Sequence, residues 1–298
     1  MNIPARLLLL MSALFASTAQ ATTFYIDNFE ITQDNQTIFN DSFEDGTTPS
    51  TGYSPPGGND LPYFTRPSPL PGPEASGKLE LDTADGDLRF SSVGGVPILI
   101  QQGRVITPQD ANGLTSSVDF STTGVFDLIE PTLPGQEFYG IRLTDFAGNN
   151  DDPNDNTQLR VHVSPSGDWR VWFVEAVGDA FVTLGAVVLN DQLLVANNII
   201  GSLTDYDQIA LTLTHEIPAG AGSSQSVTAS FTLLDLTSGG LANLAVDVGG
   251  AATLFDGEDW TRAGFLAVQR VPVPPTFALL GLGIAGFVWR RREAKHIH

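Results

Sequence analysis

Apolar residues alternate with polar or small residues along much of the chain between residues 24 and 269. Such a period of two is typical of β-strands that bury one face, and Gly, Asn, Asp and Pro separate the alternating runs. In residues 209–214 and 227–233 the odd positions are apolar and the even positions are small or hydroxylated. The pattern predicts strands near residues 24–31, 37–43, 78–82, 97–106, 115–120, 137–144, 159–163, 169–174, 181–189, 209–214, 227–233, 250–255 and 262–269.

About a dozen short strands joined by turns predict an all-β fold, a two-sheet antiparallel sandwich. No convincing helical stripe interrupts this pattern, and no internal repeat or second domain boundary is evident, so residues 22–270 are expected to form one domain. Residues 46–75 are rich in proline and glycine and are expected to form a long surface loop. Asp85-Gly86 suits a hairpin turn within residues 82–87.

One hairpin can be assigned a register. Residues 164–168 read Ser-Pro-Ser-Gly-Asp, and a three-residue loop with Gly167 in the left-handed conformation pairs Ser164 with Asp168. One face of the hairpin then carries only apolar residues, and a shift by one residue would mix the two faces. The apolar face holds Leu159, Val161, Val163, Trp169, Val171 and Phe173, and the opposite face holds Arg160, His162, Arg170 and Trp172.

This second face is a candidate saccharide-binding surface, expected to be exposed. Aromatic rings stack on sugars, and guanidinium groups donate hydrogen bonds to acidic sugars. The same residues also fit an ordinary outer sheet face, on which Arg160 and Arg170 pair with carboxylates and lean on Trp172. Both interpretations remain open at the level of sequence.

The amino-terminal segment is apolar and resembles a targeting signal. A basic residue at Arg6, an apolar run over residues 7–16 and the small-residue exit Ala19-Gln20-Ala21 follow in order. This order predicts a secretory signal peptide over residues 1–21, cleaved after Ala21. The apolar run is too short for a spanning anchor, which needs about 20 residues.

The carboxyl-terminal segment, residues 271–298, forms a separate element. It opens with a proline-rich box, continues with the uncharged run of residues 277–289, and then reaches an arginine cluster. The uncharged run predicts one short transmembrane helix, and the arginines would stay on the cytoplasmic side. The box is Val271, Pro272, Val273 and Pro274, and the cluster is Arg290, Arg291 and Arg292.

The box, the short helix and the cluster together resemble the PEP-CTERM sorting signal of Gram-negative bacteria that make extracellular polysaccharide. The resemblance covers about the last 28 residues. It implies processing by exosortase, a membrane-embedded protease, and transfer from the inner membrane to the cell surface or extracellular matrix. Val273 stands where that family has Glu, and a plain membrane anchor is the alternative interpretation.

The order of the predicted strands resembles the concanavalin A-like jelly roll. The pattern Phe39-Asn40-Asp41-Ser42-Phe43 and the strands near 78–82, 207–214 and 226–234 carry this likeness. Glucanases of that fold place acids at alternate positions of one strand, and no such run occurs here. No catalytic residue is therefore assigned, and a glycan hydrolase with an unrecognised active site stays the alternative to a non-enzymatic protein.

Charge and composition narrow the possible partners. Residues 22–270 hold nine of the 14 Lys and Arg residues and 33 of the 34 Asp and Glu residues. Such an acidic domain would repel phosphate backbones, which excludes nucleic-acid binding as a main activity. The absence of cysteine excludes disulfides and thiol chemistry.

Calcium is the one cofactor that the sequence suggests. Residues 145–156 concentrate carboxylate and amide side chains between two predicted strands, and Ca²⁺ prefers such oxygen ligands. Asp and Asn are equally the ordinary residues of turns, so a plain turn is the competing interpretation. The candidate ligands are Asp145, Asn149, Asp151, Asp152 and Asp155.

Together these observations predict an exported, membrane-tethered protein that is then released to the cell surface. Its domain is expected to be non-enzymatic, with a structural or carbohydrate-binding role in an exopolysaccharide matrix.

Overall fold

The computed structural model describes the chain in segments that together make up most of the predicted domain. Within them the protein is all-β except for the short helix α2 (Asp191–Ala196) and the 3-10 turn η2 (Leu203–Asp205). The all-β prediction is therefore confirmed. The described segments are residues 22–43, 63–66, 77–82, 87–93, 96–108, 114–130, 137–144, 156–177, 180–197, 201–217, 225–236, 245–253, 260 and 262–271.

Two sheets of eight strands each account for the described strands, and every strand pair is antiparallel. Sheet A has the order β14 (Val246–Asp247), β13 (Ser226–Leu234), β12 (Gln208–Glu216), β7 (Phe120–Asp127), β1 (Thr23–Gln33) and β2 (Gln36–Asp41), with β15 (Ala252–Thr253) beside β13 and β4 (Leu79–Asp82) beside β1.

Sheet B contains the predicted hairpin next to its β11 edge. Its order is β11 (Ala180–Leu189), β10 (Trp169–Val177), β9 (Asn156–Val163), β8 (Glu137–Thr144), β16 (Arg262–Val271), β6 (Val96–Pro108) and β3 (Tyr63–Arg66), with β5 (Asp87–Val93) beside β6.

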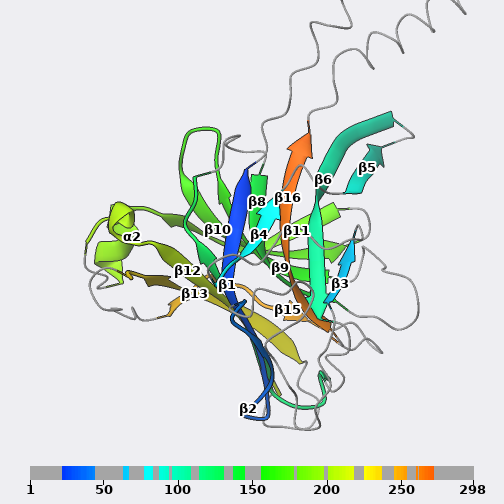
Figure 1. The fold of residues 1–298 in the computed structure, drawn as a ribbon, viewed down its shortest axis with the longest axis vertical. Coiled ribbons are helices and arrows are strands. Elements are labelled where there is room, and N and C mark those ends of the chain that lie inside the picture. The colour runs from blue at the N-terminus through cyan, green and yellow to red at the C-terminus, as the bar shows by residue number, and fades with distance from the viewer. Residues whose placement is uncertain are drawn as a thin grey trace, which may run out of the picture.

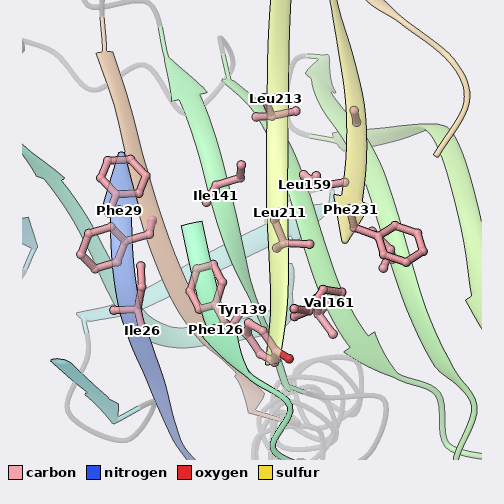
Figure 2. Close-up of a cluster of buried hydrophobic side chains, with 14 of the residues drawn as sticks. Ile26, Phe29, Phe126, Tyr139, Ile141, Leu159, Val161, Leu211, Leu213 and Phe231 are labelled. Carbon is pink, nitrogen blue, oxygen red and sulfur yellow. The ribbon is translucent and has the colours of Figure 1, made fainter. Parts of the chain in front are cut away.

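The core lies between the two sheets, as the sandwich prediction requires. Phe24 on β1 packs on Tyr139 on β8, with ring centroids 4.7 Å apart, and Phe29 packs on Phe265 of β16 at 5.1 Å. All four side chains are at most 1% exposed. Figure 2 shows part of this core, to which strands of both sheets contribute. The arrangement is compatible with a jelly roll.

The inner and outer faces of sheet A follow the twofold alternation. Burial alternates along β7 and along most of β12, because every second side chain enters the core. The outward residues are mostly hydroxylated and contact one another across strands: Thr32 Oγ1 lies 2.7 Å from Ser121 Oγ, and Thr123 Oγ1 lies 3.0 Å from Thr212 Oγ1.

Strands β8 and β9 of sheet B differ, because every residue of both strands is buried. Gly140 shows how closely these strands approach. A Cβ atom at this position would lie 2.0 Å from the carbonyl oxygen of Leu159 and 2.9 Å from Cα of Arg160. Only glycine fits there without moving backbone.

The predicted register of the hairpin is confirmed. Trp169 pairs with Val163 and Trp172 with Arg160. The Ser164 amide donates to the Asp168 carbonyl at 2.8 Å, and Gly167 has a φ of 89°, the left-handed conformation that the loop requires.

Several local predictions need correction. Strand β7 begins at Phe120, where the predicted strand 115–120 ends, because residues 116–118 form a turn and a bend. Strand β3 lies inside the predicted loop 46–75. The predicted hairpin turn within 82–87 is wrong, since β4 pairs with β1 in sheet A whereas β5 pairs with β6 in sheet B.

The two ends of the domain lie close together. Strand β1 begins and strand β16 ends at the same end of the sandwich, the upper end in Figure 1. Strand β8 lies beside β16 there, since Glu137 pairs with Gln269. The first and the last residue of the domain that the structure describes, Thr22 and Val271, therefore lie at one end of the sandwich.

Candidate saccharide-binding face and sorting tail

The four predicted saccharide-binding residues do lie together. Arg170 pairs with His162 and Trp172 pairs with Arg160, so all four side chains share the outer face of sheet B. The structure thus brings together the residues that the hairpin register predicts, and it also shows how each is held.

Arg160 is built into the sheet surface. Its guanidinium carbon lies 4.4 Å from the centroid of the Phe138 ring on β8, which is a cation–π contact. Its Nε donates to Gln158 Oε1 at 2.6 Å, and the side-chain nitrogen of Gln158, Nε2, in turn donates to Asn156 Oδ1. Only 3% of Arg160 is exposed. A sugar therefore has little access to this guanidinium group.

His162 supports the tryptophan beside it. The imidazole stacks on Trp172 with centroids 4.4 Å apart and an angle of 23° between the planes, and His162 itself is buried. The stack fixes one face of the indole ring. Trp172 stays partly exposed, and its partner on β11 is the small, exposed Ala186, which leaves the ring accessible from that side.

The prediction of a wholly exposed face is thus wrong for Arg160 and His162, because β9 is buried on both of its faces. The accessible part lies at the β10–β11 edge, where the Arg170 side chain is 37% exposed and Val188, its partner on β11, is 38% exposed. Arg170 Nη2 also lies 3.8 Å from Asp168 Oδ2, at the limit of an ion pair. We call Arg170, Trp172, Ala186 and Val188 the edge platform.

A second charged cluster, on sheet A, has no signal in the sequence. Lys78 Nζ lies 2.7 Å from one Asp127 oxygen and 3.4 Å from Asp27 Oδ1, so the ammonium bridges two carboxylates. The side-chain nitrogen of Gln208, Nε2, donates to both carboxylates as well. These four residues come from four distant parts of the chain, and only the strand order of sheet A brings them together.

The pKa values of Asp27 and Lys78 are both raised, but for different reasons. Burial, followed by the nearby charge of Asp127, raises the pKa of Asp27 above its ordinary value. Burial alone would lower the pKa of Lys78, but the hydrogen bond to Asp127 and the charges of both carboxylates outweigh it and raise that pKa. The cluster therefore favours a charged lysine and makes the charged form of Asp27 costly.

Several predictions lie beyond the described residues. The candidate calcium ligands at positions 145, 149, 151, 152 and 155 are among them, as are the signal peptide and the tail after Val271. In the segments that the structure does describe, no three His, Asp or Glu side chains are grouped as a metal site would require. Within the same segments no helix has the length and apolarity needed to cross a bilayer.

The last strand leads directly into the predicted tail. Strand β16 extends to Val271, the first residue of the proline-rich box, which pairs with Ile100 on β6. The box therefore begins at the edge of the folded domain.

The comparison with family models identifies the PEP-CTERM protein-sorting motif over residues 270–292. The matched segment starts one residue before the predicted tail and ends at Arg292, the last residue of the arginine cluster. No curated protein matches the chain. No solved structure matches it either. The sorting-signal prediction is thus confirmed: the chain carries the signal of an exosortase substrate, which directs an exported protein toward the cell surface.

Proposed function

We propose that this protein is a non-enzymatic surface component that holds acidic polysaccharide at its edge platform. Residues 1–21 would direct export through the Sec pathway and be removed after Ala21. The tail would then hold the protein in the inner membrane until an exosortase-type protease processes it.

The observation that carries the binding proposal is the geometry around Trp172. The indole ring is fixed on one side by the stacked His162, while its β11 neighbour is the small Ala186. The Arg170 guanidinium lies on the same face of the same strand, two residues away. A fixed, partly exposed ring beside a cation can stack on a sugar and donate hydrogen bonds to its carboxylate.

The local charge at the edge platform, in contrast to the net negative charge of the domain, favours an acidic rather than a neutral ligand. In a domain with 33 acidic residues, the partly exposed Arg170 provides a local positive charge that neutral sugars do not need. Binding to a polyuronate should therefore weaken as salt is raised, since exposed charges about 10 Å apart are screened at 0.1 M salt.

Co-sedimentation of the full-length protein with alginate tests this proposal, with dextran as the neutral polymer. We expect Trp172→Ala and Arg170→Ala each to weaken alginate binding about tenfold, because each removes one anchoring contact. Thr228→Ala, on the outer face of sheet A, is the matched control and should bind as the parent does. Equal binding by all four proteins would contradict the edge platform. Release of new reducing ends from alginate would instead support the hydrolase alternative.

A further inference from the structure

The residue that follows the predicted cleavage site is buried against a carboxylate. The Thr22 backbone nitrogen donates to Glu137 Oε1 at 2.9 Å, and its hydroxyl donates to Glu137 Oε2 at 2.5 Å. Glu137 is completely buried and Thr22 is 4% exposed. In the chain as described, this nitrogen is a neutral peptide amide, because Ala21 precedes it.

The surrounding strands fix both partners. Thr23 pairs with Asp82 on β4, and Phe24 packs on Tyr139, two residues after Glu137. Gln269 on β16 pairs directly with Glu137 and is also completely buried, and neither atom of its amide has a hydrogen-bond partner among the described residues. We call Thr22, Glu137 and Gln269 the amino-terminal cluster.

From this geometry we infer that the cluster is a binding site for the protein's own processed amino terminus. The inference rests on the proposed removal of residues 1–21. Cleavage of the Ala21–Thr22 peptide bond by water leaves a carboxylate on Ala21 and an α-amine on Thr22, which carries a proton near neutral pH. The same nitrogen then faces Glu137 as a cation, so one peptide hydrolysis creates an ion pair in a buried position.

The change from amide to ammonium alters the energetics of the cluster. Before cleavage the two donors that Thr22 offers to this buried carboxylate, its backbone amide and its hydroxyl, are neutral. After cleavage the carboxylate gains a full counter-charge and a shorter, stronger class of hydrogen bond. The ammonium also offers two more N–H donors than the amide, and Gln269 Oε1 is a buried acceptor on the neighbouring strand. Processing thus stabilises the end of the sandwich at which Thr22 and Val271 lie.

A double-mutant cycle on the full-length, exported protein tests this inference. One background has the native junction. In the other, Gly-Ser is inserted between Ala21 and Thr22, which keeps the cleavage site but makes the Thr22 nitrogen an amide again. Glu137→Gln is introduced into both, and unfolding by urea is measured. We expect Glu137→Gln to lower the folding equilibrium constant at least about tenfold more in the native background. Equal losses in the two backgrounds would overturn the inference.

Amine labelling gives an independent result if Glu137→Gln does not fold. The processed chain has three amines, those of Thr22, Lys78 and Lys295, which mass spectrometry distinguishes. We expect reductive methylation of the Thr22 amine to be at least tenfold slower in the native protein than that of the new terminus in the insertion variant, while Lys78 reacts equally in both. Equal rates at the two termini would overturn the ion pair. A mature chain that begins at another residue would overturn the proposed cleavage instead.

Discussion

Some of the buried and charged side chains of this protein make their polar contacts with residues that lie far away in the sequence. Glu137 is buried against Thr22, which lies 115 residues earlier, and Lys78 bridges Asp27 and Asp127. Neither contact follows from local spacing, because each requires the strand order of a complete sheet. This is why sequence patterns identify strands well and polar clusters poorly.

The closest backbone approach gives a prediction at Gly140. Alanine there would place a methyl group against the Leu159 carbonyl oxygen, which cannot move without breaking the β8–β9 pairing. We expect Gly140→Ala to lower the free energy of unfolding by about 3 kcal/mol or more in urea titrations. Gly167→Ala is the control: its Cβ would meet nothing within 4 Å, so only the positive φ opposes it, at a cost of about 1 kcal/mol. Equal effects would contradict the close approach.

The charged cluster on sheet A predicts unequal effects for its two carboxylates. Asp127→Asn removes the closest partner of Lys78 and should cost about 1 kcal/mol at pH 7. Asp27→Asn should cost less or stabilise, because burial raises the pKa of Asp27 and so disfavours its charged form in the folded protein.

The pH dependence follows from the same shift. A raised pKa means that Asp27 holds its proton more tightly in the folded state than in the unfolded state, in which an aspartate has a pKa of about 3.9. The parent therefore gains stability relative to Asp27→Asn as pH falls from neutral through the raised pKa toward about 3.9. Urea titrations of both proteins at several pH values measure this difference, and the opposite slope would show that Asp27 is better stabilised as a carboxylate.

At the scale of elements, the hairpin of β9 and β10 shows what the sequence pattern can predict and what it cannot. Its register follows from Gly167 and from the parity of its apolar residues, and the structure agrees with it. The burial of Arg160 and His162 could not be predicted, because twofold alternation says which residues share a face and not whether that face is covered.

Two other elements show why alternation fails locally. In β7 the core positions between Phe120 and Phe126 are Thr122 and Gly124, so the apolar signal is diluted, although both phenylalanines have the correct parity. Helix α2 is too short for a helical stripe. Its one local signal is Asn190, whose side chain accepts from the Leu193 amide at 2.9 Å in the manner of a helix cap.

The complete burial of β8 and β9 predicts where the fold is most resistant to opening. We expect the amides of both strands, such as those of Ile141 and Leu159, to exchange with deuterium most slowly, at rates set by global unfolding. Strand β2 lies at the edge of sheet A and has exposed residues at Gln36 and Thr37, so its amides should exchange much faster than those of β8 and β9. Hydrogen-exchange mass spectrometry resolves these segments, and faster exchange in β9 than in β2 would contradict this ranking.

At the scale of the whole molecule, the position of the two ends connects fold and sorting. Strand β1 begins and β16 ends at the same end of the sandwich (Figure 1), and the PEP-CTERM motif begins within the last two residues of β16. A tail held in the membrane would therefore place this end of the domain, with the amino-terminal cluster, closest to the bilayer. The edge platform is carried on the opposite edge of sheet B from β6 and β3.

The most direct test is the location of the chain with and without its tail, in hosts with and without an exosortase. Truncation after Val271 keeps β16 whole and removes most of the motif. Surface labelling and membrane fractionation should find the full-length protein at the surface only when exosortase is present, and in the inner membrane otherwise. The truncated protein should stay in the periplasm of both hosts. Delivery of the truncated protein to the surface as efficiently as the full-length chain would contradict the account.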